Sequence, residues 1–399
     1  MSIKNNIIPH KMRRALFGGL NSAAEAVTPG HPDKTCDQIA CKILDEALKS
    51  KRKGDDKIRV AIEMVASDGK IYIGGEVSEN VKRVLTDDKV KKISQSIFNK
   101  LGYSSKIDFK IEVFPNINIQ SDDIRKGSGT GVDSDTEKGN TGAGDQGIMC
   151  GYAINIPEFE YCPAAFWFAK KLSQKLYNVA IEKREILNLF ADGKTQIIIK
   201  DGKIDHVTIA IHHDKYWSDK QDDLKKEIYE KVIKPVIGNI DYENCQINGT
   251  GKFEKGSIWA DAGEVGRKIV IDQMGPDIPV GGGALCGKDP SKVDITAALM
   301  ARFIAKNIVA NNLADEALVQ FAFTIGNPMP DIFHIFTKNW ILEDLTPYDW
   351  CTNHFNISVQ EMIDTLCLEN PLGWSYEEAA MFGFYGDTKF PWEKIITFK

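Results

Sequence analysis

The sequence lacks the patterns that mark several common classes of protein. Its eight cysteines include no C-x-x-C pair and no Cys/His spacing of a zinc site. No stretch reaches the roughly 18 apolar residues of a membrane span. Acidic residues outnumber basic ones, 56 to 50, and a net charge of −6 argues against a nucleic-acid or membrane-surface partner. We therefore expect a cytoplasmic protein with reduced, mostly buried thiols, no nucleic-acid partner and no membrane partner.

Residues 1–24 carry no acidic residue and lack the apolar run of a secretion signal. The basic residues there are Lys4, Lys11, Arg13 and Arg14. Such a stretch fits either an organelle transit peptide or a basic leader without fixed structure, and we prefer the second. We assign residues 1–19 to this leader.

Three stretches, 59–77, 195–212 and 319–336, read as a strand, a turn and a second strand, because β-branched residues flank turn residues. They are separated by about 125–135 residues, and each is followed by a helix candidate, at 81–101, 219–236 and 358–368. The pattern predicts three similar α+β units, each a sheet covered by helices. Three unrelated hairpins are the alternative.

Two further helices are expected at 35–48 and 294–311. Each begins where a charged, glycine-bearing loop ends. Because a helix N-terminus presents free N–H groups and the positive end of the helix dipole, both positions suit an anion.

The first of these loops is Gly30-His31-Pro32-Asp33-Lys34. His31 and Lys34 are candidates to contact phosphate oxygens, and Asp33 is a candidate ligand of a divalent cation. A capped helix start with solvated charges remains the alternative.

A second loop, residues 142–147, has the sequence GAGDQG and presents Asp145 from a tight backbone bend. A plain turn would explain the same string. The stretch before it is polar and without periodicity, so we expect a mobile loop at 123–141, with Gln120 near its start.

The third and fourth loops, residues 261–269 and 281–294, lie close together in the sequence. The latter reads GGGALCGKDPSKVD and nearly satisfies the P-loop pattern, but Asp289 stands where the Mg²⁺-coordinating Ser or Thr is needed. We therefore reject a P-loop kinase. The charged residues of the two loops predict a cradle for polyphosphate and metal, with a solvated surface as the alternative. They are Arg267, Lys268, Lys288 and Lys292 with Asp261, Asp289 and Asp294.

The sequence has no G-x-S-x-G nucleophile elbow, and no cysteine has a neighbouring histidine that pairs with it in sequence. His212-His213 falls at a predicted strand end, where we expect a surface pair rather than a metal site.

GHPDK, GAGDQG and GGGALCGKDPSKVD, in this order and spacing, resemble the signatures of the S-adenosylmethionine synthetase family over residues 24–393. The resemblance implies an α+β fold of three βαββαβ-type domains with pseudo-threefold symmetry, for which we assign residues 20–122, 142–254 and 255–399. It also implies a homodimer or homotetramer with active sites at the dimer interface. The implied reaction joins ATP and L-methionine into S-adenosylmethionine and hydrolyses the triphosphate to pyrophosphate and phosphate.

The resemblance also implies a role for individual residues. The catalytic residues would be His31, Lys194, Arg267 and Lys288. ATP would bind to these residues and to Asp192 (ribose), Phe253 (adenine), Lys252, Asp261, Lys268 and Ala284. Methionine would bind to Glu76, Gln120, Asp145, Asp261 and Lys292. Two Mg²⁺ ions would bind at Asp33 and Asp294, and K⁺ at Glu63.

The sequence departs from the family pattern around these residues, for example at Thr28-Pro29 before GHPDK and at Leu285-Cys286 in the third signature. The charged residues are all present, so we expect activity. The alternatives are an ATP-dependent phosphotransferase that uses the same cradle and a catalytically silent paralogue that binds an active subunit. The second would be expected to lose some of the charged residues, and none is lost.

Overall fold

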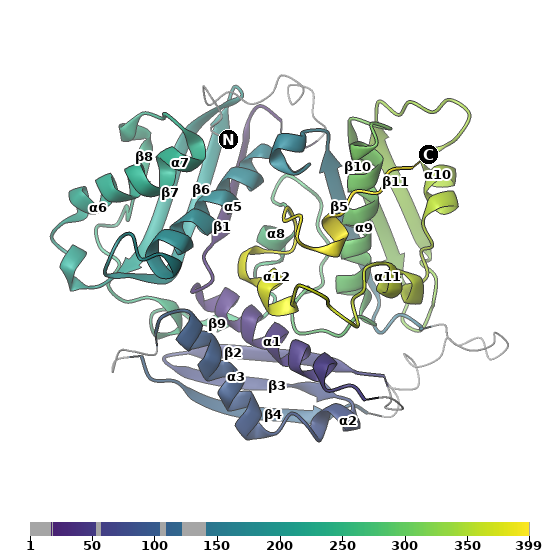
Figure 1. Ribbon diagram of the computed structural model, residues 1–399, viewed down its shortest axis with the longest axis horizontal. Coiled ribbons are helices and arrows are strands. Elements are labelled where there is room, and N and C mark those ends of the chain that lie inside the picture. The colour runs from purple at the N-terminus through teal and green to yellow at the C-terminus, as the bar shows by residue number, and fades with distance from the viewer. Residues whose placement is uncertain (1–16, 18, 53–56, 104–108, 122–140, 399) are drawn as a thin grey trace.

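The computed structural model describes residues 17, 19–52, 57–103, 109–121 and 141–398. The predicted mobile loop, apart from Thr141, and the leader, apart from residues 17 and 19, lie outside the described residues. Figure 1 shows three sheets, each covered by helices, arranged around the centre of the molecule.

The first sheet has the strand order β4-β3-β2-β9. Its strands are β2 (Val60–Ser67), β3 (Lys70–Val77), β4 (Glu112–Ile119) and β9 (Gly263–Glu264). β2 and β3 form the predicted hairpin around Asp68-Gly69, which both adopt positive φ angles (47° and 76°). Burial alternates along β2, so one face of the sheet packs on the core and the other is open.

The second sheet has the order β1-β6-β7-β8 and contains the second predicted hairpin. Its strands are β1 (Ser22–Val27), β6 (Leu189–Lys200), β7 (Lys203–His213) and β8 (Cys245–Ile247). The third sheet has the order β11-β10-β5 and contains the third hairpin. Its strands are β5 (Gly147–Ile154), β10 (Glu316–Phe323) and β11 (Ile332–Lys338).

The three sheets repeat one arrangement, in which a hairpin is joined at one edge by an antiparallel strand from another third of the chain. β1 comes just before β2 in the chain but pairs with β6 of the second sheet. β5 comes just before β6 but pairs with β10 of the third sheet. β9 follows β8 but pairs with β2 of the first sheet. In the first two sheets, a parallel strand completes the other edge. This repetition confirms the predicted α+β fold of three similar units.

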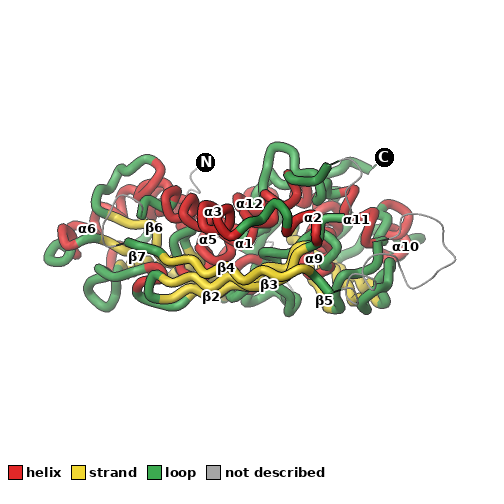
Figure 2. Tube along the Cα trace, turned by 90° about the horizontal axis from the view of Figure 1, so that it is seen from below, coloured by secondary structure: helices red, strands yellow, loops and turns green. Residues whose placement is uncertain are grey.

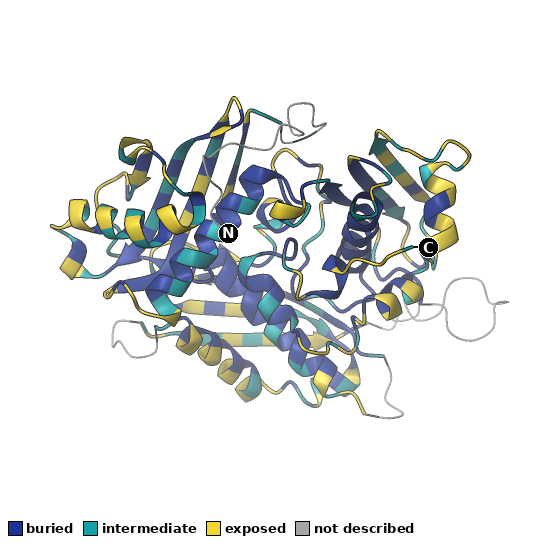
Figure 3. Cartoon of the chain, turned by 45° about the horizontal axis from the view of Figure 1, so that its top comes forward, coloured by how far each residue is buried: buried dark blue, intermediate teal, exposed yellow. Residues whose placement is uncertain are grey.

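Each exchanged strand leads into a long helix that packs on a different sheet. These helices are α1 (Pro32–Lys49), α5 (Ala164–Tyr177) and α9 (Val293–Ala310). α1 packs on β2 and β9, α5 on β1 and β6, and α9 on β5 and β10. Figure 3 shows these helices as largely buried, and in α9 only Ala310 is not buried. The molecule is therefore held together by cyclic exchange rather than by three separate cores.

The predicted helices are confirmed with small changes at their ends, except that the single helix expected at 81–101 is divided into two, Glu79–Lys82 and Asp87–Lys100. α1 begins at Pro32, three residues before the expected start, because proline suits the first helical position and His31 caps the helix. The remaining α-helices are α2 (Glu79–Lys82), α3 (Asp87–Lys100), α6 (Gln221–Ile228), α7 (Lys234–Ile237), α8 (Ile269–Asp272), α10 (Pro347–His354), α11 (Val359–Thr365) and α12 (Tyr376–Phe382). Figure 2 shows α1, α3, α5 and α12 on one side of the molecule and β2, β3 and β4 along the other.

Short helical turns connect these elements. The 3₁₀ turns are η2 (Pro157–Phe159), η4 (Lys215–Trp217), η6 (Tyr242–Asn244), η7 (Ser257–Trp259) and η8 (Pro391–Glu393), and the π-helical turns are η3 (Asn178–Glu182) and η5 (Tyr229–Ile233). η5 joins α6 to α7, so the predicted helix at 219–236 is continuous except for this π-turn.

A buried ionic cluster ties the C-terminal segment to α9. Glu393 accepts hydrogen bonds from Arg302 Nε and Nη2, both at 2.9 Å, and from Lys306 Nζ at 2.7 Å. Burial alone would raise the pKa of Glu393, but Arg302 and Lys306 outweigh burial and lower it. The carboxylate is therefore ionised in the core.

All eight cysteines are free, and seven of them are buried, as expected; Cys367 is exposed. Within the described parts of the chain, none of the helices combines the length and apolar character needed to span a bilayer.

Candidate active site

His31 forms the N-cap of α1 with its side chain buried. Its Nδ1 accepts a hydrogen bond from the backbone N–H of Asp33 at 3.2 Å. Burial, with the positive charges of Lys268 and Lys194 nearby, lowers the pKa of His31 to about 3. The imidazole is therefore neutral, and because Nδ1 is the acceptor, its proton is on Nε2. His31 thus offers a neutral N–H donor at the start of a helix.

Asp33 joins the first and third loops. Its Oδ1 accepts a hydrogen bond from the backbone N–H of Glu264 at 2.9 Å, and its Oδ2 accepts one from Lys268 Nζ at 2.5 Å. Burial opposes ionisation, but these two donors outweigh burial and lower the pKa of Asp33. A carboxylate and an ammonium group therefore lie beside His31.

Lys34 does not contact a phosphate site, and that prediction is wrong. Its side chain is fully buried, with Nζ 2.8 Å from Asp272 Oδ1 and 3.1 Å from Asp37 Oδ2. Burial alone would lower the pKa of Lys34, but Asp272 and Asp37 raise it. Asp37 Oδ1 also accepts a hydrogen bond from Gly266 N–H at 2.9 Å, so this ion cluster supports the loop that carries Arg267 and Lys268.

Asp37, Asp272 and Cys286 have the spacing of a metal site. The ammonium group of Lys34 already lies against both carboxylates and supplies the positive charge that a metal ion would provide. We therefore interpret the cluster as structural.

Asp192 and Lys194 reach the site from β6. Asp192 is buried, and its Oδ2 accepts a hydrogen bond from the backbone N–H of Ser257 at 2.6 Å; burial raises its pKa to about 7. Lys194 is exposed and close enough to His31 to lower the pKa of that imidazole. Asp261 and Arg267 are both exposed, on the loop next to Lys268.

The segment that contains Lys252 and Phe253 follows β8. Lys252 forms an exposed ion pair with Glu254 at 3.1 Å, and Phe253 is half-buried. Phe253 packs beside His212 and His213, which are both fully buried. The prediction of a surface histidine pair is therefore wrong, because β7 continues to His213 and the segment after β8 covers its end.

Lys288 and Asp294 form a second ion pair, with Lys288 Nζ 2.5 Å from Asp294 Oδ2. Asp294 is in the first turn of α9, and glycines surround it. A Cβ at Gly147 would lie 3.1 Å from Asp294 Oδ1, and a Cβ at Gly283 would collide with the carboxylate. The loop glycines thus leave the space that this carboxylate occupies.

Asp289 is fully buried and anchors the fourth loop rather than facing a ligand, so its place in the predicted cradle is wrong. It accepts hydrogen bonds from Val60 N–H at 2.8 Å and from Ser291 Oγ at 2.6 Å, and it forms an ion pair with Lys292. Ile62 N–H also donates to Gly287 O at 2.9 Å. The loop thus runs along the edge of β2.

Three further predicted residues lie beside this loop. Gly144 N–H donates to Ser291 O at 2.8 Å, which holds the neighbouring Asp145 next to the loop. Gln120 Nε2 donates to Glu76 Oε1 at 2.8 Å. Glu76 pairs with Ala61 across the β2–β3 hairpin, and Ala61 forms a bridge to Lys288.

Glu63 is on the open face of β2. The pKa of Glu63 is raised, mainly because the side chain is partly buried. Lys288 opposes this rise, and the charge of Glu264 adds to it. Ala284 lies against Gly266: a Cβ atom added to Gly266 would lie 2.6 Å from the Cβ of Ala284.

Apart from Lys252, Phe253 and Ala284, the predicted residues thus form two groups. The α1 group comprises His31, Asp33, Asp192, Lys194, Asp261, Arg267 and Lys268. The α9 group comprises Glu63, Glu76, Gln120, Asp145, Lys288, Lys292 and Asp294. Among the residues that the structure describes, no hydrogen bond or ion pair joins one group to the other.

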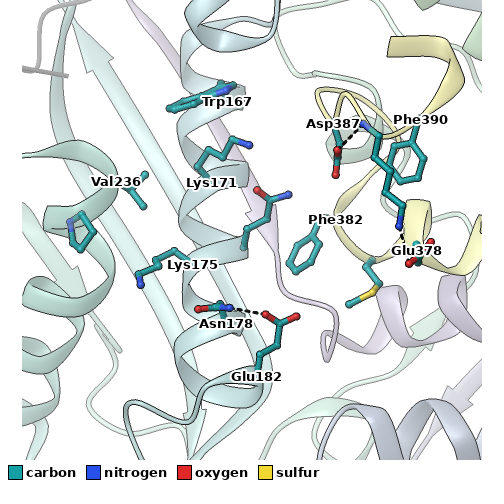
Figure 4. A pocket seen from close by; sticks show the side chains of 14 residues that line it. Trp167, Lys171, Lys175, Asn178, Glu182, Val236, Glu378, Phe382, Asp387 and Phe390 are labelled. Carbon is teal, nitrogen blue, oxygen red and sulfur yellow. Dashed lines mark hydrogen bonds and ion pairs between the residues drawn. The ribbon is translucent and has the colours of Figure 1, made fainter. Parts of the chain in front are cut away.

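A surface pocket of about 600 Å³ between α5 and the segment around α12 contains none of the predicted residues (Figure 4). Trp167, Lys171 and Phe382 line it, and Glu378 pairs with Lys389 at 2.8 Å. This ion pair is 41% exposed at both side chains, whereas the Lys268–Asp33 and Lys288–Asp294 pairs are at most 15% exposed.

Sequence comparison matches three family descriptions along the chain. They are the N-terminal domain of S-adenosylmethionine synthetase at residues 20–122, the central domain at 140–253 and the C-terminal domain at 255–394. The S-adenosylmethionine synthase of Treponema denticola is 38% identical over 389 residues, which cover 93% of this chain and 95% of that protein. That of Chlorobium phaeobacteroides is 35% identical over 392 residues, covering 93% and 94%.

A solved structure shows the same architecture. It is described as an unusual S-adenosylmethionine synthetase from Campylobacter jejuni and aligns with a TM-score of 0.79 at 29% identity, covering 94% of this chain and 97% of that one.

The fold, with its three domains matched in order along the chain, is that of a transferase. The chain belongs to the S-adenosylmethionine synthetase family. Its enzyme class is therefore methionine adenosyltransferase, which synthesises S-adenosylmethionine.

Proposed function

We propose that the sulfur of methionine attacks C5′ of ATP, so that the S–C5′ bond forms and the C5′–O bond breaks. The triphosphate leaves with the bonding electron pair and is then hydrolysed to pyrophosphate and phosphate. A thioether sulfur carries a lone pair and no proton, so the attack needs no general base. The difficulty is the negative charge on the leaving group.

The observation that carries this proposal is the neutral His31 between cationic side chains. Its Nε2–H donates without adding a positive charge, and Lys268 and Lys194 lie nearby. These groups suit the developing charge on the C5′ oxygen and on the phosphates, and we assign Arg267 and Lys288 to the phosphates as well.

The carboxylates of Asp33 and Asp294 suit Mg²⁺, because hard oxygen donors are its preferred ligands. The glycines at 147 and 283 leave the room that the Asp294 carboxylate occupies, next to Lys288. We propose that these two residues hold two Mg²⁺ ions and that Glu63 holds K⁺. The bound cations would neutralise charge on the triphosphate.

The remaining residues position the two substrates in our proposal. Asp192 contacts the ribose, Phe253 stacks on adenine, and Lys252 and Ala284 border the nucleotide. Glu76, Gln120, Asp145, Asp261 and Lys292 bind methionine. The pairing of Gln120 with Glu76 and of Lys292 with Asp289 supports this assignment, because paired side chains are held in fixed orientations.

We further propose a homodimer, or a tetramer of two dimers, in which the α1 group of one subunit meets the α9 group of its partner. Support comes from the open face of the first sheet. Val65, Tyr72 and Phe114 are 43–50% exposed there, and they border a hollow of about 500 Å³ beside Glu63 and Glu264. An exposed apolar patch of this kind marks an interface.

Two inactive variants test the shared site. Lys268→Met removes a cation from the α1 group and Lys288→Met one from the α9 group. When both chains are co-expressed, mixed dimers would contain one intact site, and about a quarter of wild-type activity should return. No recovery above the separate variants would contradict the shared site.

The eight free cysteines support our proposal of a cytoplasmic location. The activity itself is tested by incubating the purified protein with ATP, L-methionine, Mg²⁺ and K⁺ and analysing the products by mass. S-adenosylmethionine with phosphate and pyrophosphate is expected. ADP or AMP transfer products would favour the alternative phosphotransferase, and no S-adenosylmethionine above a no-enzyme control would contradict the proposal.

A further inference from the structure

His213 is the last residue of β7, and its imidazole is fully buried. Its Nε2 accepts hydrogen bonds from the backbone N–H of Phe253 at 3.0 Å and from Gln221 Nε2 at 3.1 Å. Nδ1 lies 2.8 Å from Asp214 O. These contacts agree on one tautomer, in which Nδ1 carries the proton and Nε2 is the acceptor.

The backbone of His213 contacts the same residue. His213 N–H donates to Phe253 O at 3.0 Å, so both backbone groups of Phe253 are bound by one histidine. Gln221, which contacts the ring, donates in turn to Trp217 O at 2.7 Å. The imidazole is therefore fixed in rotation, and Phe253 is fixed by it.

The residues after Phe253 are held in a similar way. His212 Nε2 lies 3.2 Å from Glu254 O, and a Cβ at Gly256 would lie 2.6 Å from the His212 ring. Ser257 N–H donates to Asp192 at 2.6 Å. Residues 253–257 are thus attached at three points, while the ring of Phe253 is half-buried.

We infer that His213 is a positioning residue that sets the Phe253 ring for the adenine of ATP. The inference rests on the proposed function, in which Phe253 stacks on adenine. Its consequence is specific: loss of the Nε2 acceptor changes the binding of the nucleoside part of ATP and leaves the triphosphate part unchanged, because the phosphate-binding side chains lie on other segments.

The test compares ATP with inorganic tripolyphosphate, both with Mg²⁺ and without methionine, by isothermal titration calorimetry on the full chain. His213→Leu removes the acceptor, and His213→Asn can keep a donor to Asp214 O with its amide nitrogen but leaves no acceptor at the Nε2 position for Phe253 N–H. Both should weaken ATP binding about tenfold and leave tripolyphosphate binding unchanged. His213→Gln, whose Oε1 replaces Nε2, should restore ATP binding to within about threefold of wild type.

The control is His206→Leu, the same substitution at a half-buried position of the same strand, which should bind both ligands as wild type does. Amide hydrogen exchange supplies a second readout: residues 253–257 should exchange faster in His213→Leu and His213→Asn and return to the wild-type rate in His213→Gln.

Equal losses for ATP and tripolyphosphate, or no loss for either, would overturn the inference. A wild-type protein that binds tripolyphosphate but not ATP would overturn it as well. Normal ATP binding without formation of S-adenosylmethionine would instead contradict the proposed function and leave the role of His213 in place.

Discussion

The carboxylate of Asp294 lies in the space that a side chain at position 283 would need. A Cβ built on Gly283 collides with the Asp294 carboxyl group, and the same carboxylate pairs with Lys288 at 2.5 Å. The glycine and the aspartate come from the two ends of one signature loop. The Asp294 carboxylate can therefore take this position only because residue 283 has no side chain.

Replacement of Gly283 by alanine should displace Asp294. We expect Gly283→Ala to lower kcat at least about tenfold and to raise the Mg²⁺ concentration needed for half-maximal activity, since the proposed ligand moves. Gly282→Ala is the matched control, because nothing lies within 4 Å of a Cβ there. Steady-state kinetics across a Mg²⁺ series measures both, and equal behaviour of the two variants would contradict the account.

Removal of either partner of the second ion pair should slow turnover. We expect Lys288→Met and Asp294→Ala each to lower kcat by about 10² or more, because stabilisation of the leaving triphosphate is lost. Product formation at saturating ATP and methionine measures this. Near-native turnover in both variants would mean that the phosphate site is elsewhere.

A substitution can distinguish the roles of the two ring nitrogens of His31. Asparagine at position 31 can keep the cap of α1 and removes the Nε2–H donor, so His31→Asn should fold normally and lower kcat about 10². Thermal unfolding and kcat are the two measurements.

The pH profile adds a second test of His31. Because burial lowers the pKa of His31 to about 3, its imidazole stays neutral above that value, and it should cause no loss of activity between pH 5 and 8. A wild-type profile with an acid limb near pH 6.5 that disappears in His31→Asn would contradict this.

The buried Glu393 should stabilise the fold in a pH-dependent way. At pH 7, Glu393→Gln should lower the free energy of unfolding by about 3 kcal/mol, because Arg302 and Lys306 lose their buried counter-ion. The pKa of Glu393 is lowered in the folded protein, so its contribution is fully present above the unfolded value near 4.5 and decreases as the pH falls below it.

Denaturant titration at pH 7 and pH 4 measures this difference. Glu378→Gln is the control, since the exposed pair of Glu378 with Lys389 should change stability by less than about 1 kcal/mol. A difference between wild type and Glu393→Gln that grows as the pH falls would have the wrong sign.

Local patterns in the sequence predicted the hairpins and helices, because these elements depend on residues that are close together in the chain. The hairpin at Asp68-Gly69 follows from a turn dipeptide between β-branched runs, and the helix after His31 follows from amphipathic spacing and a cap. The exchange of β1, β5 and β9 between sheets depends on pairing across more than a hundred residues, and no local pattern records it.

In the candidate site, too, local sequence patterns predicted some features, and others depend on tertiary contacts. Asp33, Lys268, Lys288 and Asp294 could be found because their charges cluster in glycine-bearing loops. Lys34 and Asp289 belong to those loops too, yet tertiary contacts direct them into the core, where Asp272 and Lys292 neutralise them. The burial of His213 could not be predicted, because the end of that strand is covered only by the segment around Phe253, which is distant in the sequence.

The central claim, attack at C5′ with cleavage of the C5′–O bond, is tested most directly with ATP that carries ¹⁸O in the bridge between C5′ and the α-phosphorus. Mass analysis of the products locates the label. Cleavage of the C5′–O bond predicts ¹⁸O in pyrophosphate or phosphate and none in S-adenosylmethionine. Label that remains in a nucleoside product would show cleavage at phosphorus and contradict the account.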